Sequence, residues 1–378
     1  MRIRNAETYN SSKKCFIRAD LEIEDGKFAE IINTGSKKPA EAKIIPGFID
    51  IHSHGAAGVD IFGANSGALV EMSAYYAQNG VTTLFLATMS ERHDKIMRMI
   101  EETKKARPGA KIDFRGIHVE GPYINKNKRG AHNPEYIREP NMAELDEMMA
   151  AILDCGLAMH MTVAPELDGA FEFMEAAIKK GATISMGHTE ASGEILKKAA
   201  ELGAKSYTHL FNGMAPMHHR NAGVAGYALI GGTYAEIICD GIHLCPEFVS
   251  LTEKAKGIDK IILVSDSMAA AGLPDGSYNL GSDDGVKVEN GKAFMTNPDG
   301  TETIAGSTTN LSKELENFVK FTGRSVQSSL LTVTKNPAEC VGIYDRKGSI
   351  ETGKDADFIV LGGKNEIKEV YAKGEKIF

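Results

Sequence analysis

Several features that define other classes of protein are missing from this sequence of 378 residues. No apolar run approaches the roughly 20 residues that a membrane-spanning helix needs. The first ten residues, MRIRNAETYN, lack the apolar segment of a secretory signal. The five cysteines are an odd number without close pairing, which favours reduced thiols over a disulfide framework. We therefore expect a soluble protein that is located in the cytoplasm.

A long block of Lys or Arg is missing as well. The formal net charge is −8 and the isoelectric point is about 5.8, so we expect neither nucleic acid nor a membrane surface as a partner. Hydrophobic residues make up 42% and charged residues 25% of the chain, which are ordinary values for a globular protein. The length exceeds the usual limit for one core and predicts one large domain with a smaller partner.

Both ends of the chain have the pattern of small antiparallel strands. Short apolar runs separated by turns occupy residues 15–17, 21–23, 28–32, 44–45, 358–361 and 369–372. A short sheet needs a partner that buries its face. The sequence therefore predicts one small β-sandwich domain built from both termini, residues 1–46 plus 345–378.

Between these ends, residues 47–344 alternate strand-like and helix-like segments. The strand runs are 47–51, 81–87, 112–119, 157–163, 183–186, 205–208, 236–239 and 260–264. The helical stretches are 66–79, 93–107, 143–155, 170–179, 190–202, 224–230, 246–256 and 308–321, with a hairpin expected at 286–288 and 293–295. This α/β alternation, repeated about eight times, predicts a parallel (β/α)8 TIM barrel, although an open doubly wound sheet would alternate in the same way.

Side chains of the kind that bind metal ions follow the strand runs at their carboxyl ends. They are His52, His54, Glu120, His188, His209 and Asp266. In a barrel the carboxyl ends of all strands lie on the face that carries the chemistry. Imidazoles and carboxylates that converge from separate strands suit Zn²⁺ or Fe²⁺. One such histidine is a weak signal, but six residues at strand ends predict a site for a divalent metal, whereas His118 and His160 lie within strands and are interpreted as structural.

Eight stretches of the sequence resemble the amidohydrolase superfamily, in order and over almost the whole chain. They are PGFIDIHSHG at 46–55, HVEGPYI at 118–124, KRGAHNPEYI at 128–137, MGHTEA at 186–191, THLFNGM at 208–214, DGIH at 240–243, VSDSMAAAG at 264–272 and AGS at 305–307. The H-x-H pattern occurs throughout the superfamily. HVEGP, GAHNPE and THLFNGM are more specific, and resemble the members that deacetylate amino-sugar phosphates.

The resemblance implies a set of metal ligands. Glu120, His188 and His209 would hold the principal ion, and His52 and His54 could hold a second one together with Asp266. Some members of the family lack the first two histidines and use one metal, whereas this sequence has both, so one or two ions per subunit are expected. Glu120 would then bridge, where other members use a carbamylated lysine.

The resemblance also implies a reaction, which is hydrolysis of N-acetyl-D-glucosamine 6-phosphate to D-glucosamine 6-phosphate and acetate by a metal-activated water. Asp266 would accept the proton of the water and pass it to the amine. His132 would help to stabilise the oxyanion. The phosphate would be bound by Asn212, the backbone amide of Gly213, His243 and Arg220. In relatives the arginine reaches the site of the neighbouring subunit, which implies a homodimer.

Two other functions remain compatible with parts of the sequence. A deacetylase of N-acetylgalactosamine 6-phosphate, or another metal-dependent cyclic amidohydrolase, would share the metal ligands, so only the sugar- and phosphate-binding residues discriminate. A barrel that has lost its metal and serves as a binding protein would lack several ligands. This chain has all of them, which favours an enzyme.

Overall fold

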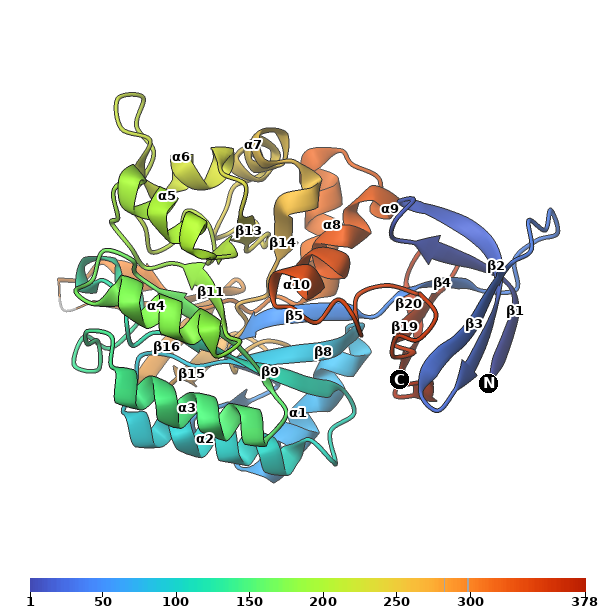
Figure 1. Ribbon diagram of the computed structural model, residues 1–378, viewed down its shortest axis with the longest axis horizontal. Coiled ribbons are helices and arrows are strands. Elements are labelled where there is room, and N and C mark those ends of the chain that lie inside the picture. The colour runs from blue at the N-terminus through green and yellow to red at the C-terminus, as the bar shows by residue number, and fades with distance from the viewer. Residues whose placement is uncertain (282, 298) are drawn as a thin grey trace.

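The computed structural model describes residues 1–281, 283–297 and 299–378. Its larger part is a barrel of parallel strands with helices around it, and a sheet made from both chain ends lies at one side (Figure 1). The predicted fold class, a (β/α)8 barrel with a small terminal β-sandwich, is confirmed. Over the described residues, no helix combines the length and the apolar character needed to cross a membrane.

Eight parallel strands form the barrel, and each overlaps a strand run expected from the sequence. They are β5 (Phe48–Ser53), β8 (Val81–Ala87), β9 (Asp113–Glu120), β10 (Ala158–Val163), β11 (Thr183–Met186), β12 (Ser206–Tyr207), β13 (Tyr234–Ile237) and β14 (Ile261–Leu263). The segment after β14 closes the ring against β5. There the backbone N–H of Asp266 donates to the carbonyl of His52 over 2.9 Å, and that of His54 donates to Ser267 over 2.8 Å.

Helices cover the outside of the barrel. They are α1 (Ser66–Gln78), α2 (His93–Ala106), α3 (Met142–Asp154), α4 (Ala170–Lys179), α5 (Gly193–Leu202), α6 (Gly223–Ile230), α7 (Pro246–Lys256) and α8 (Leu311–Thr322), and shorter pieces are η1 (Lys126–Lys128), η2 (Ile258–Lys260), α9 (Val326–Ser329), η3 (Leu330–Val333) and α10 (Lys335–Cys340). Helix α5 begins later than expected because the Ser192 hydroxyl caps it by accepting the N–H of Ile195.

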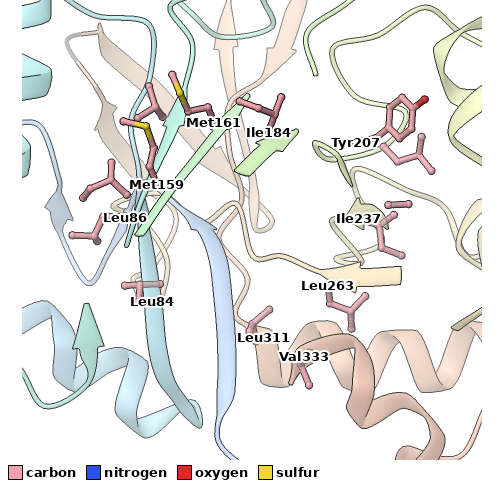
Figure 2. Close-up of a cluster of buried hydrophobic side chains, with 14 of the residues drawn as sticks. Leu84, Leu86, Met159, Met161, Ile184, Tyr207, Ile237, Leu263, Leu311 and Val333 are labelled. Atoms are coloured by element: carbon pink, nitrogen blue, oxygen red, sulfur yellow. The ribbon is translucent and has the colours of Figure 1, made fainter. Parts of the chain in front are cut away.

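The main hydrophobic core lies between the strands and the surrounding helices (Figure 2). Leu86, Met161, Ile184 and Leu263 belong to it, one from each of four barrel strands. Side chains alternate along a strand, so His160, next to Met161, faces the inside of the ring. Its Nε2 atom lies 3.2 Å from a carboxylate oxygen of Glu236 on β13.

A four-stranded antiparallel sheet follows the last barrel strand, and we call it the cover sheet. Its strands are β15 (Gly276–Leu280), β16 (Asp283–Glu289), β17 (Lys292–Thr296) and β18 (Glu302–Ile304). The expected hairpin is its central pair, and the outer strands escaped prediction because they are short and mostly polar. Leu280 and Val286 of the cover sheet pack with Met89 and Met268 in a separate apolar cluster near the barrel mouth.

The terminal sheet has seven strands in the order β21-β20-β19-β4-β1-β2-β3. Its members are β1 (Arg2–Asn10), β2 (Cys15–Glu24), β3 (Lys27–Asn33), β4 (Lys43–Pro46), β19 (Phe358–Leu361), β20 (Ile367–Ala372) and β21 (Glu375–Lys376); a small pair, β6 (Gly55–Ala56) and β7 (Val59–Asp60), follows β5. The ring centroids of Phe28 and Phe358 are 6.1 Å apart although their strands are not neighbours. The sheet therefore folds over a small core of its own, as a sandwich does.

Candidate metal centre and substrate cavity

The six metal-type side chains expected from the sequence meet at the carboxyl end of the barrel. His52 lies on β5 and His54 directly after it, and Glu120 is the last residue of β9. The other three follow β11, β12 and β14 at short distance and are His188, His209 and Asp266. All six are buried, with at most 7% of their surface exposed.

One oxygen of Glu120 faces two imidazoles. The Oε1 atom lies 3.0 Å from Nε2 of His188 and 2.9 Å from Nε2 of His209, and these two nitrogens are 3.0 Å apart. The Nδ1–H of His188 donates to the carbonyl of Lys128 over 2.6 Å. That bond leaves the lone pair of a neutral His188 ring on Nε2, which points at Glu120.

The other oxygen of Glu120 faces a second pair of imidazoles. The Oε2 atom lies 3.3 Å from Nε2 of His52 and 3.2 Å from Nε2 of His54. Asp266 completes this group, since its Oδ1 is 3.0 Å from Nε2 of His54 and 3.5 Å from Nε2 of His52. The Nδ1–H of His54 donates to the carbonyl of Ala87 over 3.0 Å, which again leaves Nε2 for the centre of the site.

The two carboxylates make the centre attractive to positive charge. Burial opposes charge on the His54 ring, but hydrogen bonds to Asp266 and Glu120 and their charges outweigh it and raise its pKa to about 10. Burial likewise opposes charge on His209, but its hydrogen bond to Glu120 and the charge of Glu120 raise its pKa to about 9. Burial disfavours the Asp266 carboxylate, yet the charge of His52 and the hydrogen bond and charge of His54 lower its pKa to about 2.

These residues fit a divalent cation. Ligands about 2 Å from one ion are about 3 Å from each other, and the Nε2 atoms of His188 and His209 have that spacing. His52, His54 and Glu120 form one group of converging donor atoms and Glu120, His188 and His209 form another. A cation in either group would replace the protons that the carboxylates otherwise draw onto the imidazoles.

Three of these side chains extend from strained backbone. The φ angles of His188, His209 and Asp266 are 48°, 30° and 46°, a region that residues other than glycine rarely adopt. Gly213 also has a positive φ, of 57°, and a Cβ atom there would lie 2.8 Å from Nδ1 of His188. Glycine at this position therefore lets the chain pass close to the His188 ring.

His132 lies at the edge of the centre and is buried. Its Nε2 atom is 3.5 Å from Oε2 of Glu120. Burial outweighs the opposing hydrogen bond and charge of Glu120 and lowers the pKa of His132 to about 4. The ring is therefore neutral near pH 7 and carries one N–H, which can donate a hydrogen bond to a developing oxyanion.

A cavity of about 260 Å³ opens above the metal-type residues. Its wall includes three residues expected to bind phosphate, Asn212, Gly213 and His243, together with His132 and all the metal-type residues except His52. His52 is completely buried beneath it. The structure therefore brings the expected sugar-phosphate residues to the same space as the metal-type side chains.

Arg220 does not line this cavity. It is exposed in the loop before α6, and its Nη1 atom lies 2.7 Å from Nε2 of His219. The loop projects from the barrel between α5 and α6 (Figure 1). Within one chain, Arg220 is therefore separate from the other expected binding residues.

The cavity also has walls that sequence reasoning missed. Met89, Leu280, Thr303 and Ile304 line it, three of them from the cover sheet. An apolar side chain in a sequence predicts a core position and not a cavity wall, so no signal pointed to Met89, Leu280 or Ile304. The two histidines interpreted as structural, His118 and His160, are fully buried below the cavity.

The chain belongs to the amidohydrolase family, whose sequence profile matches residues 44–377. This family is metal-dependent, and the structure holds groups of His and Glu able to bind an ion. The chain is 35% identical to N-acetylglucosamine-6-phosphate deacetylase of Bacillus subtilis strain 168, over 94% of this chain and 92% of that one. It is 30% identical to N-acetylgalactosamine-6-phosphate deacetylase of Escherichia coli O157:H7, over 94% and 93%.

Solved structures show the same similarity. N-acetylglucosamine-6-phosphate deacetylase from Thermotoga maritima superimposes with a TM-score of 0.90 at 32% identity, covering 100% of this chain and 99% of that one. A mutant of the enzyme from Mycobacterium smegmatis in complex with N-acetyl-D-glucosamine 6-phosphate gives a TM-score of 0.88 at 28% identity, with coverage of 100% and 99%.

Proposed function

We propose that this chain hydrolyses N-acetyl-D-glucosamine 6-phosphate to D-glucosamine 6-phosphate and acetate. One observation carries the proposal: a single cavity combines a buried cluster of imidazoles and carboxylates with Asn212, Gly213 and His243. The first group suits amide hydrolysis, and the second offers hydrogen-bond donors to a phosphate. The names of the relatives support this substrate class.

A divalent cation bound by these residues would activate a water molecule and polarise the amide carbonyl. We assign Glu120, His188 and His209 to the principal ion, and His52, His54 and Asp266 to a second one. Zn²⁺ and Fe²⁺ are the metals that the donor set favours, because it combines imidazole nitrogen with carboxylate oxygen.

The side chains of the cavity perform the remaining tasks. Asp266 is ionised, because its pKa is lowered to about 2, so it can accept the proton of the attacking water and deliver it to the amine nitrogen. The neutral ring of His132 donates a hydrogen bond to the carbonyl oxygen as charge develops there. Asn212, the backbone amide of Gly213 and His243 hold the phosphate end.

We further propose that the enzyme is a cytoplasmic homodimer in which Arg220 serves the neighbouring site. The exposed, projecting position of Arg220 supports this, since the residue cannot serve the cavity of its own chain. All five cysteines are free, as they would be in a reducing compartment. The division into a terminal domain (1–46 plus 345–378) and a catalytic barrel (47–344) belongs to the same proposal.

The experiment that tests the function is acetate release by protein stripped with a chelator and then resupplied with Zn²⁺, Fe²⁺ or Mn²⁺. The substrates are N-acetylglucosamine 6-phosphate, its galactosamine epimer and unphosphorylated N-acetylglucosamine. Turnover that requires both metal and phosphate supports the proposal. Faster turnover of the galactosamine epimer would move the assignment to that substrate, and no turnover with any metal would reject both.

A further inference from the structure

Asp240 and His243 lie on the loop between β13 and α7, and their side chains are joined directly. The Nδ1 atom of His243 is 2.8 Å from Oδ2 of Asp240. The other carboxylate oxygen, Oδ1, accepts the backbone N–H groups of Ile242 and His243, both over 2.8 Å. An ionised carboxylate only accepts hydrogen bonds, so the His243 ring carries a proton on Nδ1.

This arrangement leaves Nε2 of His243 for the cavity. The ring lines the cavity wall beside Asn212 and Gly213, and its side chain is 6% exposed. Within the described part of the chain, Nε2 has no hydrogen-bond partner of its own. The Nε2 atom is therefore held in a fixed orientation and can bind a substrate group.

Helix α8 holds the base of the loop. Glu314 accepts the backbone N–H of Cys239, and the side-chain amide of Asn317 donates to the Cys239 carbonyl over 2.9 Å. Cys239 and Glu314 are completely buried. Two hydrogen bonds to the backbone of Cys239 fix the residue that directly precedes Asp240, so the loop has a rigid anchor.

We propose that Asp240 is a positioning residue, which orients the His243 ring and keeps its Nδ1 protonated so that Nε2 binds the phosphate of the substrate. When a phosphate oxygen is on one nitrogen and Asp240 on the other, both nitrogens act as donors and the ring carries a positive charge. The proposal rests on the function proposed above, and it adds the residue that gives His243 its donor character.

A double-mutant cycle tests this role. Asp240→Asn should raise KM for N-acetylglucosamine 6-phosphate by about tenfold or more, while kcat changes by less than about threefold. In a His243→Ala background the same substitution should raise KM no further, because Asp240 acts through that ring. Asp259→Asn, at an exposed carboxylate, is the matched control and should leave KM unchanged. Additive effects in the cycle would overturn the proposal.

A second measurement does not depend on turnover. Long-range ¹H–¹⁵N spectra of the histidine rings report which nitrogen carries the proton, and the His243 signals are assigned by their loss in His243→Ala. The wild type should show a proton on Nδ1, and added inorganic phosphate should shift the Nε2 signal in the wild type but less in Asp240→Asn. A proton on Nε2 alone, or a phosphate shift that is equal in both proteins, would overturn the proposal even if the enzyme acts on another substrate.

Discussion

The backbone N–H of Ser90 donates a hydrogen bond to Nδ1 of His132 over 2.9 Å. A nitrogen that accepts a hydrogen bond carries no proton of its own, so the proton of the neutral His132 ring lies on Nε2. That atom faces the centre of the site, 3.5 Å from Glu120. The loop after β8 thus sets the tautomer of a residue that lies about 40 positions further along the chain.

His132→Ala should therefore lower kcat by about 10²–10³-fold, the usual effect of removing one donor to an oxyanion. KM should change much less, because the bond strengthens as the carbonyl becomes tetrahedral. Steady-state kinetics with the metal-loaded enzyme measure the difference. A variant with unchanged kcat would assign His132 to shaping the cavity only.

Asp266→Asn should lower kcat by about 10²–10⁴-fold, because the amide cannot accept the proton of the water. The metal bound at Glu120, His188 and His209 should remain, as those three residues are untouched. Metal analysis and kinetics on the same preparation separate the two effects. A kcat like that of the wild type would reject Asp266 as the base.

The metal content should be two ions per chain in the wild type, since each oxygen of Glu120 faces a separate pair of imidazoles. Replacing both His52 and His54 by Ala should reduce the content to one. Glu120→Gln should weaken both positions. Elemental analysis after dialysis against Zn²⁺ gives these numbers, and a single ion in the wild type would contradict the prediction.

Arg220→Ala should raise KM for the phosphorylated sugar by about 10–100-fold, since hydrogen bonds to a charged group contribute about 1.5–3 kcal/mol, and should leave kcat nearly unchanged. If the arginine serves the neighbouring site, mixing Arg220→Ala with Asp266→Asn subunits should restore sites with a normal KM. Such a hybrid combines an intact Asp266 in one subunit with an intact Arg220 in the other. Without complementation after subunit exchange, the arginine does not act across an interface.

Glu314→Gln should make the protein more resistant to unfolding at pH 8 than the wild type. Burial, with the charge of Asp240 adding to it, raises the pKa of Glu314 well above 4.5, so the folded state keeps its proton. The unfolded chain releases that proton as the pH rises above about 4.5, so wild-type stability falls as the pH increases towards the raised folded pKa. Denaturant unfolding measures the free energy of unfolding of both proteins at pH 5 and pH 8. The difference between variant and wild type should be smaller at pH 5 than at pH 8. Equal differences at both pH values would contradict the protonated state.

The sequence predicted the barrel well because its strands are buried on both faces and are short, apolar and separated by helices. The strand at Val81–Ala87 and the helix at Ala170–Lys179 have the expected bounds. The sequence pattern did not predict β1, because its residues RIRNAETYN are mostly polar. That strand exists because β2 and β4 pair with it on both sides, and such pairing with distant residues leaves no local signal.

The position of the candidate site was predicted to a similar degree, since the metal-type side chains converge where the sequence placed them. Side chains that can bind metal are recognised in a sequence by their residue type, and six of them stand at the ends of predicted strands. The tautomer of His132 depends on the backbone N–H of Ser90. Every residue except proline has such a group, so the sequence does not show which one donates to His132. The positive φ of His188 and His209 also had no signal, because only the surrounding fold holds these residues there.

The pairing of β4 with β19 has a consequence for biosynthesis. β4 ends at Pro46 and pairs with β19, which begins at Phe358. A ribosome makes β19 only after all eight barrel strands, which lie between β4 and β19 in the sequence. Until then the edge of β4 at Lys43–Pro46 lacks its partner β19, and unpaired strand edges invite pairing with other chains. The terminal sheet can therefore be completed only after the barrel strands between β4 and β19 have been synthesised.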